Sequence, residues 1–194
     1  YKRQSLDTAF TAKTTGYFSA CTTWGVFYHP DQDGKYLANV MLINSYRDRL
    51  EFPALKSQVL ELMKDWSPDT TVVEDRGSGK SLIQELTSMG VYIEPGNSSR
   101  MGAGMSNDKV ARANAVSDIF RSGVVWYNTN CQLNETTIEE CADLPKGDND
   151  DLADTATQAI KTLRERMLIG TKHDESQLFQ DDDTPVRRNQ GRMY

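Results

Sequence analysis

The sequence predicts an α/β domain built around a mixed sheet of five or more strands, with helices on both faces. Two observations predict this fold: three strand patterns follow one another at the start of the chain, and strands then alternate with helices. Strands joined by tight turns pair antiparallel, whereas strands joined through a helix pair parallel, so the two parts together give a mixed sheet. A chain of 194 residues can form one such domain with a proper core, but not two large ones.

Three strand patterns open the chain. Residues 3–10 form a short pattern that carries one acidic residue, Asp7, and residues 19–29 are rich in β-branched and aromatic side chains. The segment 30–34 (PDQDG) is a strong turn signal, after which residues 35–46 return as a third strand. The first part of the chain is therefore predicted to be an antiparallel meander.

The remainder alternates between helical and extended patterns. Pro53 opens a helix in which apolar residues recur at helical spacing and predict one buried face. The Gly/Ser-rich segment 95–106 has no periodicity and is predicted to be a loop. The apolar positions of the first helix are Leu55, Val59, Leu62, Met63 and Trp66. The elements predicted after it are strands at 70–74, 91–93 and 124–127 and helices at 81–89, 108–121 and 150–167.

The two ends of the chain carry different signals. The first residue is Tyr1 rather than Met, and a strand starts close behind it, which suggests a fragment of a longer polypeptide. From residue 171 the sequence is polar without an apolar face, so residues 1–170 are predicted as the folded domain and 171–194 as a disordered tail. The chain has no apolar run of about 18 residues and no signal-peptide pattern, so neither membrane insertion nor secretion is expected.

The charge of the chain is unevenly distributed. The net charge is −6, but the acidic residues crowd into 135–154 and 174–183, which leaves the rest of the chain without an excess of negative charge. The charge therefore does not exclude a DNA substrate. The three cysteines, Cys21, Cys131 and Cys141, lack CxxC spacing, and the chain has only two histidines. The sequence thus predicts thiols in a reducing compartment rather than a zinc site.

Acidic residues stand at the ends of two predicted strands, where such residues are disfavoured. Asp7 lies late in the first strand, and Glu74 and Asp75 end the fourth. An exposed edge position would also explain Asp7, and a charged strand end would explain the pair. Because strand side chains alternate, Glu74 and Asp75 point to opposite faces unless the strand ends between them.

A third group of carboxylates starts the last helix. Asp150 fits the role of a helix cap, which also complements the helix dipole. Asp151 and Asp154 are i, i+3 neighbours, and like charges at that spacing repel unless a cation lies near them. Ligands of mixed sheets bind at the carboxyl ends of the central strands, where these groups would meet. An all-oxygen site without histidine suits Mg²⁺ or Mn²⁺, and two such ions support phosphodiester hydrolysis.

The segment 77–81 (GSGKS) looks like the end of a phosphate-binding P-loop. The full motif requires glycine five residues before Gly79, and that position is Glu74, whose carboxylate would repel phosphates. We therefore interpret the segment as a turn that allows close approach of DNA or metal, with Arg76 and Lys80 as phosphate contacts.

Six segments in order resemble the C-terminal nuclease domain of the large terminase subunit, the DNA-packaging motor of tailed bacteriophages. Together they cover about residues 3–165, and their order and spacing make the resemblance specific although no single segment does. The segments are Leu6–Ala9, Thr22–Trp24, Arg49–Pro53, Val73–Gly79 running into Leu82–Leu86, Asp108–Ala113 and Asp150–Asp154.

The resemblance implies an RNase H-like fold and a divalent-metal-dependent endonuclease that cuts concatemeric double-stranded DNA. By motif, Asp7 would be the first metal ligand and Asp151 the third, with Asp154 nearby. The middle ligand would be Glu74 or Asp75, and the alignment of the following residues favours Asp75. A basic pair of the family falls on Lys109 and Arg112, which would contact phosphates or else form an exposed helix face.

The sequence departs from the family pattern at three places. Asn149 stands where histidine often precedes the Asp-Asp pair, Tyr17 stands where an acidic residue is common, and the loop 95–106 is longer than usual. The first two changes would alter metal affinity and leave the core carboxylates intact.

The resemblance also implies partners: an ATPase domain upstream in the same polypeptide, a portal protein and a small terminase subunit, in the cytoplasm of an infected bacterium. The fragment alone is expected to be monomeric. Two alternatives stay open at this point. One is a nuclease of the Holliday-junction resolvase or integrase type, against which segments 82–86 and 109–112 argue. The other is a DNA-docking domain without catalysis, in which the carboxylates are structural.

Overall fold

The computed structural model describes residues 1–8, 18–96, 111–144 and 150–171. Within these residues six strands form one sheet in the order β5-β4-β1-β2-β3-β6. The strands are β1 (Lys2–Asp7), β2 (Ser19–Pro30), β3 (Tyr36–Asp48), β4 (Thr70–Glu74), β5 (Glu94–Gly96) and β6 (Val125–Tyr127). The helices are α1 (Phe52–Trp66), α2 (Ser78–Ser88), α4 (Ser117–Arg121), α5 (Gln132–Asp143) and α6 (Asp151–Glu165).

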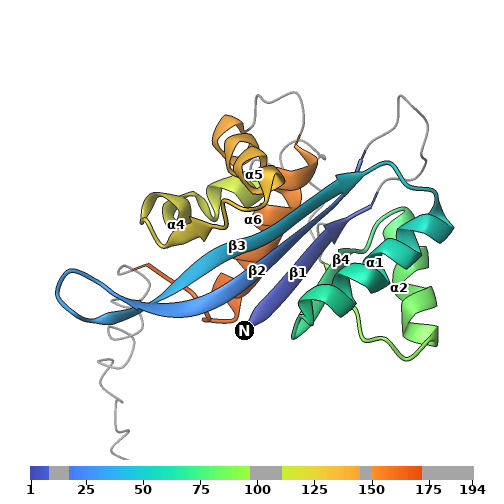
Figure 1. Ribbon diagram of the computed structural model, residues 1–194, viewed down its shortest axis with the longest axis horizontal. Helices are drawn as coiled ribbons and strands as arrows, with labels where there is room; N and C mark the ends of the chain where they lie inside the picture. Colours follow the sequence, from blue (N-terminus) through green and yellow to red (C-terminus); the bar gives the residue numbers. More distant parts are fainter. Residues whose placement is uncertain (9–17, 97–110, 145–149, 172–194) are drawn as a thin grey trace, which may run out of the picture.

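The sheet is mixed, as the sequence predicts. β1, β2 and β3 are antiparallel neighbours, which confirms the meander. β4 pairs parallel with β1, β5 parallel with β4, and β6 parallel with β3. β1 and β4 therefore lie side by side in the interior of the sheet, and their carboxyl ends share one edge (Figure 1).

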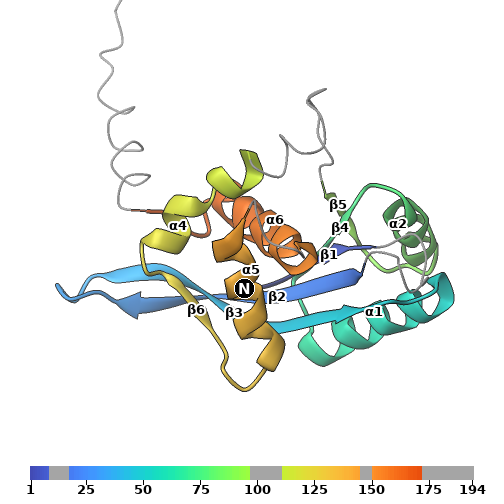
Figure 2. The ribbon, with the colours of Figure 1, turned by 90° about the horizontal axis from the view of Figure 1, so that it is seen from above.

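Helices cover both faces of this sheet, which confirms the predicted architecture (Figure 2). α1 and α2 pack on one face, and α4, α5 and α6 on the other. The core under α1 and α2 consists of Leu6, Cys21, Leu55, Val59, Leu62, Val73, Leu82, Leu86 and Ile93. The core on the opposite face consists of Trp24, Val40, Leu42, Val116, Ile119, Ala156, Ala159, Ile160, Leu163 and Ile169.

Two helices show how the sequence produces these layers. α1 has proline in its first turn and ends where Ser67 adopts a left-handed conformation with a φ of 43°. Its buried residues, Leu55, Val59 and Leu62, are those of the predicted apolar stripe. α6 lies deeper, because all residues from 151 to 160 are buried. A helix buried on every side can carry carboxylates only where they meet a compensating partner.

The side chains of β1 alternate between the two faces of the sheet. Leu6 belongs to the core under α1 and α2, and the Gln4 side chain donates to the carbonyl oxygen of Leu62 on that face at 2.9 Å. Ser5 faces the other side, where its hydroxyl donates to Gln158 of α6 at 2.7 Å. Because strand side chains alternate, Asp7 shares the α6 face with Ser5.

Some predicted elements differ from the structure. The strand predicted at 91–93 is instead β5, because Ile93 packs into the core while the chain joins the sheet only from Glu94, opposite Val72. The predicted loop 95–106 consequently begins in β5, and its residues from 97 lie outside the described part. The helix predicted at 108–121 is interrupted: residues 111–114 are helical, and α4 starts at Ser117.

α5 was not predicted, because the residues that it buries most deeply are polar. The buried residues of this helix are Asn134 and Thr137, which contact β3 through hydrogen bonds rather than apolar packing. No helix in the described part of the chain is long and apolar enough to span a membrane. Tyr17, Asn149 and the predicted tail from residue 172 onward lie outside the described residues.

Candidate active site

The carboxylates of Asp7 and Glu74 come together at the shared edge of β1 and β4. The parallel register pairs Ser5 with Val72 and Leu6 with Val73, so the next residues, Asp7 and Glu74, are opposite each other. Val73 belongs to the core under α1 and α2, so Glu74 points to the α6 face, like Asp7. The two side chains share a hydrogen bond.

Two further carboxylates approach from the first turn of α6. Asp151 and Asp154 are 8% and 6% exposed, values that are low for charged side chains. Both raise the pKa of Asp7 through their charge, which places them in its surroundings. One site thus gathers carboxylates from three elements that lie far apart in the sequence.

The crowding has a measurable electrostatic consequence. Burial and the neighbouring carboxylates Glu74, Asp154 and Asp151 raise the pKa of Asp7 from 3.8 to about 8. Burial penalises the charged form, and the hydrogen bond to Glu74 favours the protonated form of Asp7. Such a perturbed carboxyl group in a carboxylate cluster marks a candidate functional site.

Asp75 occupies a different position from Glu74. β4 ends at Glu74, and the backbone N–H of Asp75 then donates to the carbonyl oxygen of Gly96 at 3.2 Å. Among the charged neighbours of Asp7, Glu74 has the largest effect on its pKa, ahead of Asp154 and Asp151. The geometry therefore favours Glu74 over Asp75 as the middle residue of the cluster, in contrast to the preference drawn from the sequence.

The turn from β4 into α2 packs tightly against this edge. A Cβ atom at Gly79 would lie 2.1 Å from the carbonyl oxygen of Glu74, so only glycine fits there. The hydroxyl of Ser78 donates to the Thr8 side chain at 2.9 Å, which ties the turn to the end of β1. The glycine is thus required by the approach of the protein's own backbone.

Gln158 fixes α6 against the sheet below the carboxylates, and sequence reasoning missed it. Its side chain accepts from Ser5 of β1, and a Cβ at Gly96 of β5 would lie 2.1 Å from its amide nitrogen. Gln158 lies four residues after Asp154 and seven after Asp151, on the same side of the helix. That spacing from the acidic pair is the signal that could have identified it.

Comparison with known proteins agrees with this geometry. A family model described as the terminase RNase H-like domain matches residues 4–163. This chain belongs to that family. It is therefore an RNase H-fold nuclease domain of the terminase type, as the resemblance implied.

The chain was also compared with solved structures and with curated proteins. The RuvC structure from Thermus thermophilus aligns with a TM-score of 0.44 and 13% sequence identity, covering 86% of this chain and 96% of that chain. A search of curated proteins finds no match.

The donor set of the terminase domain fits a hard divalent cation. The four clustered side chains offer only carboxylate oxygens, which are the ligands that Mg²⁺ and Mn²⁺ prefer. Their mutual repulsion, seen in the raised pKa of Asp7, is the kind that a bound cation relieves. As the side chains stand, no three histidine, cysteine, aspartate or glutamate residues in the described part are close enough to hold a metal ion. The fit therefore rests on donor chemistry and charge.

The basic residues predicted to contact DNA are spread over two segments. Arg76 and Lys80 are exposed on the turn and first helical residues after β4, beside Glu74. Arg112 is half-buried on the helical residues 111–114, before α4. Lys109 lies outside the described residues.

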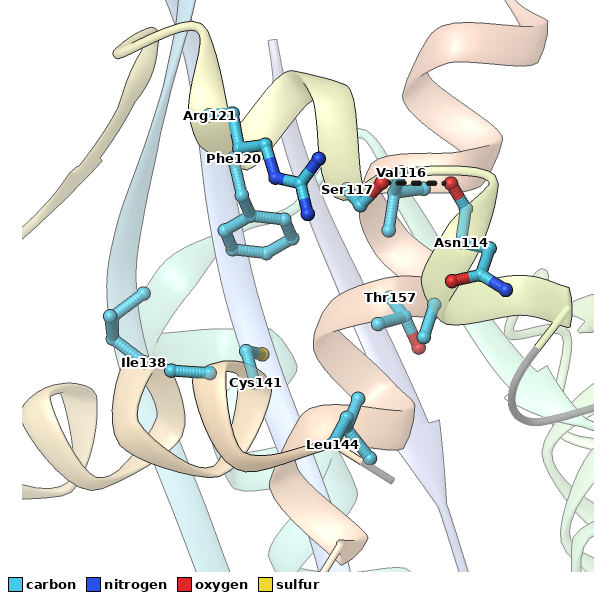
Figure 3. A pocket seen from close by; sticks show the side chains of 11 residues that line it. Asn114, Val116, Ser117, Phe120, Arg121, Ile138, Cys141, Leu144 and Thr157 are labelled. Atoms are coloured by element: carbon cyan, nitrogen blue, oxygen red, sulfur yellow. Dashed lines mark hydrogen bonds between the residues drawn. The ribbon is translucent and has the colours of Figure 1, made fainter. Parts of the chain in front are cut away.

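A separate cavity of about 400 Å³ lies between α4, α5 and α6 (Figure 3). Phe120, Ile138 and Leu144 are among its apolar lining residues, and none of the described residues that line it is acidic. It is therefore distinct from the carboxylate cluster. Burial raises the pKa of Cys141 in its wall to about 12, so this thiol is protonated at neutral pH.

Proposed function

We propose that this terminase domain is a divalent-metal-dependent endonuclease that cuts concatemeric double-stranded DNA for a viral packaging motor. The observation that carries the proposal is the convergence of Asp7 and Glu74 from the sheet with Asp151 and Asp154 from α6. Family membership supports the nuclease class, and the donor set supports Mg²⁺ or Mn²⁺.

Within this proposal, Asp7, Glu74 and Asp151 hold the metal, and Asp154 is a further ligand. Asp75 would take the middle role only if the end of β4 rearranged. Two bound ions would supply an activated water and stabilise the leaving 3′-oxygen of the phosphodiester.

Protonation and burial of the clustered carboxylates determine when the site can bind a cation. The raised pKa means that Asp7 holds a proton at neutral pH, so binding a cation requires that proton to leave. Burial of Asp151 and Asp154 keeps their carboxylates oriented toward the cluster rather than toward water. Exposed Arg76 and Lys80 would bind backbone phosphates next to it.

The remaining roles follow from the terminase family and are part of the proposal. Arg112, together with Lys109, would contact phosphates farther along the DNA. The domain would act with an ATPase domain of the same polypeptide, a portal protein and a small terminase subunit, in the cytoplasm of the bacterial host.

A plasmid cleavage assay tests the proposal. The protein is incubated with supercoiled plasmid and Mn²⁺ or Mg²⁺, with and without a chelator, at low salt because DNA affinity falls steeply with salt. We expect metal-dependent nicking and linearisation that Asp7→Asn and Asp151→Asn abolish. Asp65→Asn, an identical charge change on the exposed face of α1, is the matched control. DNA binding without cleavage by the wild type would instead indicate a docking domain.

A further inference from the structure

The first turn of α6 is capped by a side chain from another helix. Asp150 stands at the N-cap position, as predicted, but its side chain makes no capping hydrogen bond. Instead, a carboxylate oxygen of Glu140 in α5 accepts from the backbone N–H of Leu152 at 3.1 Å. An acceptor there satisfies one of the donors that every helix leaves at its start. Glu140 thus holds the peptide unit next to Asp151.

Glu140 is itself held by a charged partner. Its other carboxylate oxygen pairs with the Arg47 guanidinium of β3 at 2.5 Å, and the two side chains, Arg47 and Glu140, are 18% and 10% exposed. Arg47 also lies over the ring of Phe18, with 5.1 Å between the guanidinium carbon and the ring centroid. A charge-assisted pair that is mostly removed from water fixes its geometry more firmly than an exposed pair does.

α5 is anchored to the same strand one to two turns before Glu140. The hydroxyl groups of Thr137 and Ser45 are 2.7 Å apart, and the Asn134 amide donates to the carbonyl oxygen of Leu42 at 3.2 Å. The helix that carries Glu140 is therefore fixed to β3 by its own polar face, and the carboxylate leaves it from a defined position.

These contacts close a ring that begins and ends at the candidate active site. The sheet register pairs Asp7 with Ala20 and Ala20 with Arg47, so one row of residues runs from β1 across to β3. Arg47 binds Glu140, and Glu140 binds the first turn of α6. That turn carries Asp151, whose charge acts on Asp7.

We infer that Glu140 is a positioning residue for metal binding. By tying the start of α6 to β3, it sets where Asp151 and Asp154 lie relative to Asp7. The inference rests on the proposed function, since it assumes that these carboxylates hold a cation. In the sequence, Glu140 is one of many acids in an acidic stretch, and nothing there separates it from a solvated side chain.

If Glu140 and Arg47 acted only through their charges, removing each charge would change cation binding in the opposite direction. Removing the negative charge of Glu140 would weaken cation binding, whereas removing the positive charge of Arg47 would strengthen it. If position is what matters, either change opens the ring, and both weaken cation binding. The sign of the Arg47 effect therefore separates the two explanations.

The experiment measures Mn²⁺ binding by calorimetry for the wild type, Glu140→Ala, Arg47→Met and the double variant. Plasmid cleavage is followed against Mn²⁺ concentration, and exchange of the Leu152 amide hydrogen is measured by NMR without metal. Each single variant is expected to weaken Mn²⁺ binding roughly tenfold, as loss of an outer contact to a metal ligand typically does, and to speed the exchange. The double variant should be no weaker than the worse single variant, because both changes break one ring.

The ion pair between Lys56 and Glu85 supplies the matched control. It has the same 2.5 Å separation but joins α1 to α2 on the other face of the sheet. Lys56→Met and Glu85→Ala should leave Mn²⁺ binding and the Leu152 exchange unchanged.

Three results would overturn the inference. Tighter Mn²⁺ binding in Arg47→Met would assign the effect to charge. A lower melting temperature with unchanged Mn²⁺ binding in both single variants would mean that these contacts stabilise the fold and do not position the metal ligands. In that case the proposed function would still hold, provided that the wild type binds Mn²⁺ and cuts DNA. A wild type that neither binds Mn²⁺ nor cuts DNA would remove the proposed function, and this inference with it.

Discussion

Replacing Asp7 by asparagine should make the metal-free protein more stable while it abolishes activity. Burial and the nearby carboxylates raise the pKa of Asp7 from 3.8 to about 8. A carboxyl group with a raised pKa binds its proton more tightly in the folded state. Its contribution to stability is therefore complete below about pH 4 and is lost as the pH rises through about 8. Asparagine has the same shape, carries no charge and can still donate to Glu74.

The size of the effect follows from the shift in pKa. Each pH unit between the unfolded and folded values is worth about 1.4 kcal/mol of unfolding free energy. With the pKa moved from 3.8 to about 8, Asp7→Asn should exceed the wild type by about 3 kcal/mol near pH 6 and by at most about 6 kcal/mol above pH 8. The two proteins should be equally stable near pH 4.

Urea unfolding followed by circular dichroism, in chelator and across this pH range, measures the difference. Added Mn²⁺ should then stabilise the wild type in proportion to its occupancy and leave Asp7→Asn almost unchanged. Asp65→Asn, exposed on α1, controls for the loss of one negative charge. A constant offset between wild type and Asp7→Asn from pH 4 to pH 9 would refute the assignment of a raised pKa to this side chain.

Three other predictions concern the same edge of the sheet. Because Asp7 must lose its proton before a cation binds, the Mn²⁺ concentration for half-maximal cleavage should fall as the pH rises toward about 8, and a flat profile would contradict this. Gly79→Ala should lower the unfolding free energy by about 3 kcal/mol or more, because the new Cβ would lie 2.1 Å from a backbone carbonyl oxygen. Gly90→Ala, where the Cβ meets open space at a φ of 80°, should lower the unfolding free energy by only about 1 kcal/mol. Gly96→Ala should be rescued in part by Gln158→Ala, which removes the amide 2.1 Å from the new Cβ; additive losses in urea unfolding would argue against that contact.

The elements that the sequence predicted well are those whose own pattern decides their structure. The meander has β-branched runs separated by a turn, and α1 has an apolar stripe behind a proline, so neither depends on distant contacts. β5 was misplaced because the apolar run at 91–93 looks like a strand, although Ile93 is a core residue and the pairing starts at Glu94. α5 was missed because its buried residues, Asn134 and Thr137, are polar and hydrogen-bond to β3, while its apolar residues Ile138 and Cys141 are only partly buried.

In the candidate site, too, features set by local sequence could be predicted and features set by distant contacts could not. Carboxylates at strand ends and at a helix start could be recognised from residue type and position alone. The helix cap from Glu140 could not, because it depends on a contact between α5 and α6, and the spacing of Gln158 from the acidic pair places it on their side of α6 without revealing its bond to Ser5.

The choice between Glu74 and Asp75 as the middle metal ligand depends on the pairing register between β1 and β4. β4 ends at Glu74, so alternation along the strand assigns a face of the sheet to Glu74 but not to Asp75, which lies beyond the strand. The pairing of Leu6 with Val73 favours Glu74, since in both strands a core residue is followed directly by the carboxylate on the α6 face. Glu74→Gln should therefore abolish Mn²⁺-dependent cleavage, and Asp75→Asn should retain most of it. Both variants lose one charge at adjacent positions, so a general effect of charge would weaken them equally. Loss of cleavage in Asp75→Asn with activity kept in Glu74→Gln would mean that β4 ends differently when metal is bound.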